Sequence, residues 1–257
     1  MEKLFPKVWE VVDKYRQLCN LKSGDYSADI PFVNTEVWNE GWMLRLVVAK
    51  LHDMDSVDGC EAAKVICECS KRGWCSEGRL YPLFENEKST RADGIVGDLT
   101  LRPKTKWGFD ASSQQEGSRF VVLEAKMNSA LSKGVAVAED FDQASRYVAC
   151  MSGILSKTNC AHGILYVIAP EDRIKDVRPT VENAQKRFFK ELESKNSGKH
   201  KLRDGLNADR IRKAAERIRI ELVTWEDLIS VIPTDEGGKD INDFYTQAKV
   251  ANKVGVR

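Results

Sequence analysis

Apolar residues recur with helical spacing in the first part of the chain. Residues 4–18 form one amphipathic pattern of this kind. A second pattern is expected to begin at a cap on Asn34 or Thr35 and to run through about His52. The pattern therefore predicts two helices ahead of the first strand.

Short and nearly continuous apolar runs follow, and such runs are typical of strands that are buried on both faces. Strands are predicted at residues 80–84, 98–102, 119–126, 162–169 and 218–223. Helices are expected at about residues 136–155, at 180–192, from Asn207 or Asp209, at 225–232 and near 244–252. This order predicts one α/β domain over residues 1–257, with a mixed sheet between two layers of helices and a core at about 34–232.

The run at residues 119–126 ends in an acid-x-lysine triplet, Glu124-Ala125-Lys126. Residues two apart on a strand share a face, so the carboxylate and the ammonium should emerge side by side. Asp98 opens the strand predicted just before this one, and pairing of the two strands would bring it to the same place. Two carboxylates at that separation repel unless a cation lies between them, and Mg²⁺ favours such an oxygen site. The pattern therefore predicts a metal site.

These residues are followed by a helix that carries Gln143 and Tyr147 four positions apart. Together they resemble the PD-(D/E)xK nuclease superfamily, and the spacing is closest to its RecB-like exonuclease and restriction endonuclease-like members. The resemblance covers Arg91 to about Met151. It implies a restriction-endonuclease-like fold and a nuclease that hydrolyses phosphodiester bonds in DNA with Mg²⁺ or Mn²⁺.

The resemblance also implies a role for each motif residue. Lys126 would position or deprotonate the attacking water and stabilise the charge on the phosphate. Gln143 would orient water or phosphate, and Tyr147 would contact the substrate backbone. The implied metal ligands are Asp98, Glu124 and the carbonyl of Ala125.

The sequence leaves the identity of two metal ligands undecided. Asp93 competes with Asp98 for the first carboxylate. Glu40 interrupts the apolar stripe of the second predicted helix, and a buried carboxylate is costly unless it is paired or bound to a cation. Members of the superfamily often have an acid in this helix, so Glu40 is a candidate ligand, with Glu36 as its alternative. The other interpretation of Glu40 is a solvated acid in the first turns of a helix.

The net charge is close to zero, with 40 Lys and Arg against 39 Asp and Glu. Nucleic-acid binding would therefore need a local basic patch. The predicted nucleic-acid contacts are Arg210, Arg212, Lys213 and Arg217. A solvated, salt-bridged helix is the alternative for these residues. For the whole chain, the alternative is an inactive nucleic-acid-binding or scaffolding module with the same fold. The resemblance leaves a homodimer or a larger nuclease assembly open.

Seven cysteines, an odd number, fit a reducing compartment better than a disulfide framework. Cys60, Cys67, Cys69 and Cys75 lack the C-x-x-C spacing of common metal sites and are interpreted as packing residues. No apolar run reaches the length of a membrane span, and no signal-peptide pattern opens the chain. The sequence therefore predicts a cytoplasmic protein without a membrane partner.

Overall fold

The computed structural model describes residues 3–19, 37–85, 87, 89–101, 109–111, 118–132, 141–157, 162–194 and 201–254, without the side chains of 15–19, 100–101 and 109–111. Its elements are, in chain order, α1 (Phe5–Cys19), α3 (Glu40–Asp53), α4 (Glu61–Ser70), β1 (Trp74–Leu80), β2 (Thr90–Gly97), β3 (Leu99–Leu101), β4 (Phe109–Ala111), β5 (Arg119–Ala125), α5 (Gln143–Leu155), β6 (His162–Ala169), η1 (Glu171–Arg173), α6 (Ile174–Glu193), α7 (Ala208–Ala215), β7 (Ile218–Thr224), α8 (Trp225–Ser230) and α9 (Glu236–Ala251).

Five strands form the main sheet, in the order β1-β2-β5-β6-β7. The first three pair antiparallel, whereas β5, β6 and β7 run parallel to one another. Nearly every residue of β5 and β6 is buried, which is what parallel strands covered on both faces require. The predicted mixed sheet is therefore confirmed.

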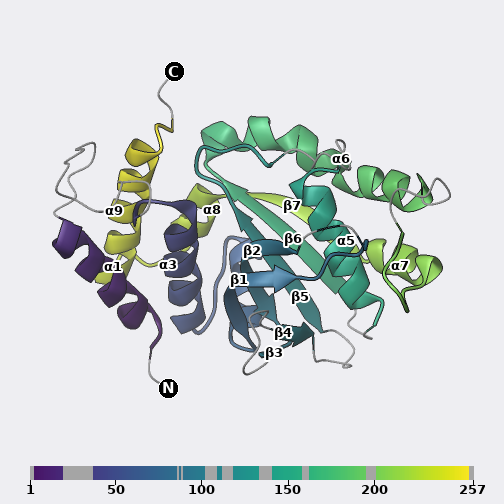
Figure 1. Ribbon diagram of the computed structural model, residues 1–257. Helices are drawn as coiled ribbons and strands as arrows, with labels where there is room; N and C mark the ends of the chain where they lie inside the picture. The colour runs from purple at the N-terminus through teal and green to yellow at the C-terminus, as the bar shows by residue number, and fades with distance from the viewer. Residues whose placement is uncertain are drawn as a thin grey trace.

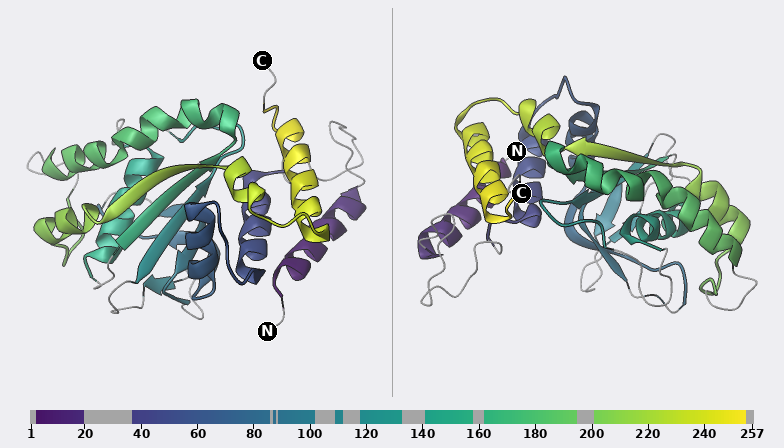
Figure 2. Two further views of the ribbon diagram at one scale, coloured as in Figure 1. Left: turned by 180° about the vertical axis from the view of Figure 1, so that it is seen from behind. Right: turned by 90° about the horizontal axis from the view of Figure 1, so that it is seen from above.

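Helices cover both faces of this sheet (Figure 1). Side chains of α5, α6 and α7 form one hydrophobic cluster with alternate residues of the strands. The intervening strand residues belong to a second cluster, which includes α1, α3, α4, α8 and α9. Figure 2 shows α1 and α9 beside α3, on the side of that helix away from the sheet. The α/β class and its three layers are therefore confirmed.

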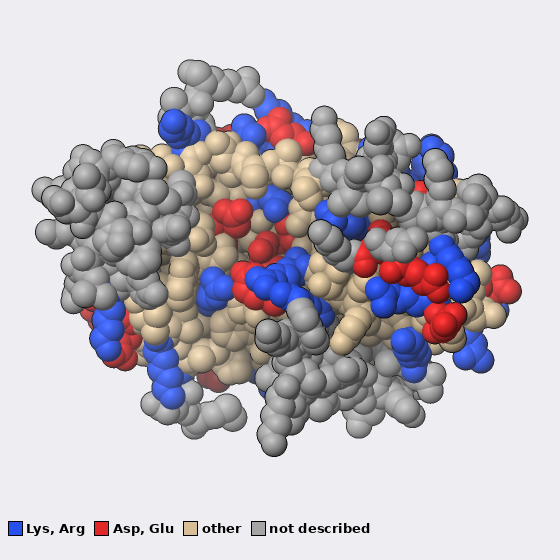
Figure 3. All heavy atoms as spheres, viewed as in Figure 1, with Lys and Arg blue, Asp and Glu red and all other residues tan. Residues whose placement is uncertain are grey.

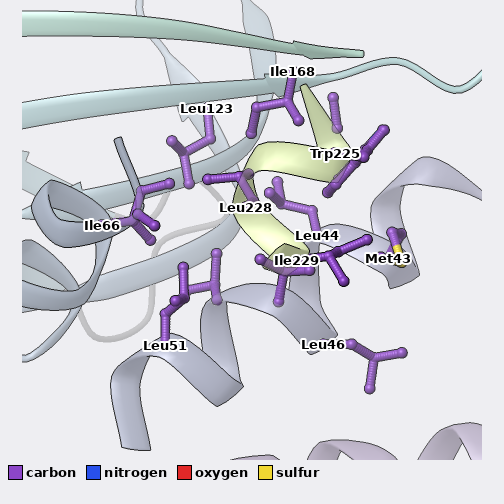
Figure 4. Close-up of a cluster of buried hydrophobic side chains, with 14 of the residues drawn as sticks. Met43, Leu44, Leu46, Leu51, Ile66, Leu123, Ile168, Trp225, Leu228 and Ile229 are labelled. Carbon is purple, nitrogen blue, oxygen red and sulfur yellow. The ribbon is translucent and has the colours of Figure 1, made fainter. Parts of the chain in front are cut away.

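The second cluster fixes α3 and α8 against the end of the sheet where β5 and β6 finish. Figure 4 shows Leu44 of α3, Leu123 of β5 and Leu228 of α8 gathered between these elements. All three side chains are at most 1% exposed. Burial of a leucine side chain contributes about 2 kcal/mol, so these contacts hold α3 firmly beside β5.

The strand that pairs with β5 is β2, and not the predicted strand at residues 98–102. The register places Gly94 opposite Leu123 and Gly97 opposite Phe120. Gly97 has a φ of +128°, and the carbonyl of Arg119 fills the space that a Cβ would need. The chain leaves the sheet at this glycine, and β3 pairs only with β4 in a small separate sheet. The predicted pairing of residues 98–102 with β5 is wrong.

The first strand is also displaced from its predicted place. It covers Trp74–Leu80, whereas the prediction was 80–84, and Phe84 makes only an isolated bridge with Leu202. β1 is a half-exposed edge strand and lacks the apolar run that marks interior strands. The pattern of apolar residues therefore did not predict a strand there. The predicted strands at 162–169 and 218–223 are confirmed as β6 and β7.

The predicted helices are present, and they differ mainly at their ends. The side chain of Asn39 caps α3, whereas the predicted caps Asn34 and Thr35 lie outside the described residues. Positions 136–140, ahead of α5, lie outside them as well. Helices α6 and α9 begin about two turns early, because Pro179 and two glycines after Glu236 read as helix breakers. Within the described ranges, none of these helices has both the length and the apolar character that crossing a bilayer requires.

Candidate active site

Strands β2 and β5 separate just beyond the pair formed by Gly94 and Leu123. Asp93, the next residue of β2, lies at this opening. Its Oδ2 accepts a hydrogen bond of 2.8 Å from the backbone N–H of Ala125. The carboxylate thus satisfies a backbone donor that the neighbouring strand no longer reaches. Asp93 is thereby held beside the end of β5, where the acid-x-lysine triplet emerges.

Glu124 points into the helical layer that contains α5, and it is only 1% exposed. Its Oε1 lies 2.5 Å from the Lys126 ammonium and accepts a hydrogen bond of 2.5 Å from the Gln143 amide. The hydroxyl of Tyr147 donates to Oε2. Both oxygens of this buried carboxylate therefore have partners, and the spacing of Gln143 and Tyr147 brings both to Glu124 as predicted.

The backbone on both sides holds the Gln143 and Lys126 side chains in place. The amide oxygen of Gln143 accepts a hydrogen bond of 3.2 Å from the N–H of Ser132, which leaves its NH₂ group facing Glu124. Lys126 donates its N–H to Ile168 at 2.8 Å, and its carbonyl accepts one of 2.9 Å from the Trp225 indole. The side chain of Lys126 is 12% exposed. The ammonium is therefore positioned by β6 and α8, although β5 has already ended.

Burial raises the pKa of both carboxyl groups, and the charge of Glu124 adds to this effect at Asp93. Burial, and after it the negative charge of Glu124, raises the pKa of Asp93 to about 7. Burial also raises the pKa of Glu124, although the positive charge of Lys126 acts in the opposite direction. The buried Glu124 and the half-buried Asp93 thus share one ammonium, and full ionisation of both leaves negative charge that a cation would neutralise.

The other two groups keep their protons. Burial acts to lower the pKa of Lys126, but the charges of Glu124 and Asp93 outweigh this effect and the pKa is raised. Burial and Glu124 raise the pKa of Tyr147 well above its ordinary value. Lys126 is therefore a stable positive charge and not a free base, and Tyr147 is a hydrogen-bond donor to Glu124.

Asp93 opens onto a surface pocket of about 520 Å³ at the N-terminal end of α3. Glu40 lines the pocket, and its charge acts on both Glu124 and Lys126. Glu77 lies between the pairs Ser76–Gly94 and Gly78–Ala92 of the β1–β2 ladder and has a φ of +56°, which is rare outside glycine. The lining residues are Asn39, Glu40, Gly41, Arg45, Glu77, Asp93 and Asn252. The pocket gives solvent and small solutes a route to an otherwise buried cluster.

Asp98 lies near the other end of β5 from Glu124. Its Oδ2 forms an ion pair of 2.9 Å with Arg72 and accepts a hydrogen bond of 3.3 Å from the N–H of Arg119. Arg119 and Glu124 are five positions apart on one strand, a distance of about 16 Å. The prediction that Asp98 converges with the acid-x-lysine triplet is wrong. Asp93 takes that position, because β2 and not the segment after Gly97 pairs with β5.

The donor set at Asp93 fits a hard divalent cation. Among the residues described, no three His, Cys, Asp or Glu side chains form a ready metal-binding group. Mg²⁺ needs fewer, because it commonly takes one or two carboxylates and completes its shell with water and substrate phosphate. Asp93, Glu124 and the Ala125 carbonyl supply oxygens of this kind, and Glu40 lines the same pocket. Burial and the charge of Glu124 raise the pKa of Asp93, so a cation bound beside it would favour its ionised form.

The predicted basic contacts lie away from this cluster. Arg217 donates to the carbonyl of Leu155 at the C-terminal end of α5, whereas Gln143 begins that helix about 18 Å away. Arg212 forms an ion pair of 2.8 Å with Glu193. The exposed members of the group are Arg210 and Lys213. The structure does not bring these four residues to the candidate site, and their binding of nucleic acid stays a prediction.

The four cysteines near α4 are partly or fully buried. Cys67 and Cys69 are buried within the helix, and Cys60 and Cys75 are half-buried on either side of it. Burial raises the pKa of the thiols of Cys67, Cys69 and Cys75, which disfavours the thiolate that binds metal. This environment agrees with a packing role.

Comparisons of the chain with protein-family models, with curated proteins and with solved structures found no match. The case for this site therefore rests on its contacts and charges. The sequence patterns did not point to Arg45 or Glu77, which form an ion pair of 3.2 Å at the pocket. No local signal identifies them, because only the β1–β2 register and the position of α3 place them beside Asp93.

We expect the metal-free protein to lose stability as the pH rises from about 4 to about 7. The folded state raises the pKa of Asp93 to about 7, whereas an unfolded aspartate ionises near 3.9. Between these values the folded state binds more protons, so a rise in pH favours unfolding. Urea denaturation in EDTA at several pH values should show a flatter pH dependence for Asp93→Asn. Asp98→Asn is the control and should keep the wild-type trend, and equal slopes in wild type and Asp93→Asn would contradict the assignment.

Proposed function

We propose that this protein is a Mg²⁺- or Mn²⁺-dependent nuclease with a restriction-endonuclease-like fold, which hydrolyses phosphodiester bonds in DNA. One observation carries the proposal: the Asp93 and Glu124 carboxylates meet beside the Lys126 ammonium at the opening between two strands. A pocket connects this cluster to solvent. The resemblance of the motif residues to the PD-(D/E)xK superfamily supplies DNA as the expected substrate.

The residues divide the proposed chemistry among them. Asp93, Glu124 and the Ala125 carbonyl would hold the metal ion, with Glu40 as a further ligand from α3. A bound Mg²⁺ or Mn²⁺ would neutralise charge on the phosphate. Lys126 keeps its proton next to Glu124, so it would stabilise the negative charge that grows on the phosphate and would not remove a proton from water.

Gln143 and Tyr147 serve this arrangement differently. The amide of Gln143 is half-buried and fixed by Ser132, so it can orient a phosphate or water beside Glu124. Tyr147 is fully buried, and its hydroxyl donates to Glu124 and lies 2.7 Å from the carbonyl oxygen of Arg91. The expected contact of Tyr147 with the substrate backbone stays a prediction, and its burial favours a role through Glu124. In this role Tyr147 would be a positioning residue that fixes the Glu124 carboxylate through its hydroxyl.

The fold gives the proposed site a rigid frame. β5 pairs antiparallel with β2 on one side and parallel with β6 on the other. The cluster lies where these two parts of the sheet diverge, and α3 and α5 approach it from opposite faces. A site built at the ends of paired strands holds its groups in fixed geometry, which a metal-dependent hydrolase needs.

The experiment is a cleavage assay with the purified wild-type protein. Linear, circular, single-stranded and double-stranded DNA are each incubated with Mg²⁺, with Mn²⁺ and with EDTA. We expect cleavage of at least one DNA form with either metal, and none in EDTA. Matched RNA substrates test the choice of nucleic acid. Binding without cleavage of any form would contradict the enzyme and favour a non-catalytic nucleic-acid-binding module.

A further inference from the structure

Arg45 of α3 is the basic side chain of the pocket that opens at Asp93. Among the described residues that line this pocket, Glu40, Glu77 and Asp93 are acids and Arg45 is the one Lys or Arg. Figure 3 shows Asp and Glu side chains next to Lys and Arg side chains near the centre of the face on which α3 and β1 lie. The proposed metal site therefore shares its pocket with a guanidinium.

Two contacts hold the Arg45 guanidinium in place. Its Nη2 lies 3.2 Å from Oε1 of Glu77, and its Cζ lies 4.8 Å from the centroid of the Trp42 ring, a cation–π contact. The backbone of α3 also approaches it closely at Gly41, where a Cβ would lie 3.2 Å from Nη1. The guanidinium is thus fixed beside the first turn of α3, at the pocket onto which Asp93 opens.

The ion pair between Arg45 and Glu77 is accessible to solvent. The two side chains are 22% and 43% exposed, and ion pairs of this kind contribute little to the stability of a fold. A guanidinium binds phosphate oxygens through the same N–H donors that it offers to a carboxylate. A phosphate that enters the pocket can therefore take the place of the Glu77 carboxylate at Arg45.

The net charge of the pocket decides when a phosphate can bind there. With Glu40, Glu77 and Asp93 all ionised, their negative charge outweighs that of Arg45, and the pocket repels anions. The acids also act on one another, since the charge of Glu77 contributes to the raised pKa of Asp93. A divalent cation at Asp93 would balance the excess negative charge. Binding of a phosphate at Arg45 should therefore depend on the metal.

We propose that Arg45 binds a phosphate of the nucleic-acid strand, next to the scissile phosphate, once a metal ion has bound at Asp93, and that Glu77 pairs with the guanidinium until then. The scissile phosphate itself is left to the Lys126 ammonium, which lies beside Glu124. The inference rests on the proposed function and gives that site an order of binding, with the metal first and the nucleic acid second.

The test measures DNA binding with and without Mg²⁺. All proteins carry Lys126→Met, which is expected to bind Mg²⁺ without cutting the DNA. Binding is followed by fluorescence anisotropy of a labelled single strand at several salt concentrations. In Mg²⁺, Arg45→Ala should weaken binding roughly ten-fold, the size of one lost charge-assisted hydrogen bond, and reduce the salt slope by about 0.7. In EDTA the same change should alter neither quantity, because the acids of the pocket keep phosphate away.

Arg119→Ala is the matched control for this change. Arg119 also forms an ion pair of 3.2 Å with a glutamate, Glu68, but near the other end of β5. Its loss should leave DNA binding unchanged in both conditions, and Arg45→Lys, which keeps the charge, should restore the salt slope. Thermal unfolding checks that each variant is folded. Unchanged binding by Arg45→Ala in Mg²⁺, an equal loss in EDTA, or an equal loss in Arg119→Ala overturns the proposal.

Glu77→Gln tests the carboxylate that pairs with Arg45. It should strengthen DNA binding in EDTA, because glutamine has a similar size and no longer neutralises the guanidinium. The gain should disappear when Glu77→Gln is combined with Arg45→Ala, since it acts through the guanidinium. An equal gain in the double variant would be a general effect of charge and would overturn the role of Glu77.

The failure of this inference is distinguishable from the failure of the proposed function. With Lys126 intact, Arg45→Ala should raise the KM for DNA roughly ten-fold and change kcat little, because the contact is the same in the ground and transition states. Cleavage with the wild-type KM would overturn the role of Arg45 and leave the nuclease standing. Metal-dependent DNA binding through Arg45, in a wild type that cleaves nothing, would support Arg45 and contradict the enzyme.

Discussion

Asp93→Asn should reduce metal-dependent cleavage by roughly 1,000-fold or more, whereas Asp98→Asn should keep most of the wild-type rate. The metal supplies several kcal/mol of charge stabilisation, and each 1.4 kcal/mol is a factor of ten in rate. The Asp93 carboxylate contacts the backbone of Ala125 beside Glu124, whereas Asp98 pairs with Arg72 near the start of β5. Asparagine keeps the size of the side chain and can still accept the hydrogen bond from Ala125.

The measurement is the initial cleavage rate against Mg²⁺ concentration for the two variants and the wild type. Isothermal titration calorimetry with Mg²⁺ should show weaker binding for Asp93→Asn alone. The pair is well matched, because both changes replace one aspartate by asparagine, at positions only five apart in the chain. An inactive Asp98→Asn beside an active Asp93→Asn would return the metal site to the position that the sequence first indicated.

Local spacing predicted the parts of the site that lie on one element. Glu124 and Lys126 are two apart on a strand, and their ion pair of 2.5 Å follows from that spacing. Gln143 and Tyr147 are four apart on a helix and both contact Glu124. The apolar run of β6 could also be predicted, because interior strands carry a continuous apolar signal.

Pairing between distant segments could not be predicted in the same way. The choice between Asp93 and Asp98 depends on which segment pairs with β5, and that depends on the turn at Gly97. A strand of three residues such as β3 has nearly the same apolar signal whether it joins the main sheet or leaves it. Arg79 and Arg91 show the same limit, since twelve positions separate two side chains that the hairpin places directly opposite each other.

The density of basic residues along the sequence did not predict which basic side chains lie near the candidate site. The cluster around Arg212 is dense along α7, yet Arg212 pairs with Glu193 and Arg217 binds the carbonyl of Leu155. Two of these four basic side chains are therefore engaged by other parts of the fold. Arg91, by contrast, is only two residues from Asp93 along β2.

Lys126→Met should retain Mg²⁺ binding and lose cleavage by roughly 100- to 1,000-fold, the usual loss when one group that stabilises transition-state charge is removed. Lys126 does not offer an oxygen ligand, so its loss leaves the carboxylates of Asp93 and Glu124 in place. Methionine has a similar length and no charge, so the change isolates the ammonium. The measurements are single-turnover cleavage rates and Mg²⁺ titration by calorimetry.

We also expect Lys126→Met to change the thermal stability of the protein. Glu124 is 1% exposed, and without Lys126 it becomes a buried carboxylate that has lost its counterion. Breaking a buried ion pair in this way costs about 3–5 kcal/mol, so the metal-free variant should unfold at a lower temperature. Mg²⁺ should then raise the unfolding temperature more in Lys126→Met than in wild type, because the metal replaces the missing positive charge beside Glu124. Lys126→Arg is the control, since it keeps that charge and should show the wild-type response to Mg²⁺. A Lys126→Met protein that cleaves at the wild-type rate would remove the ammonium from the mechanism, and one that no longer binds Mg²⁺ would show that Lys126 organises the carboxylates instead.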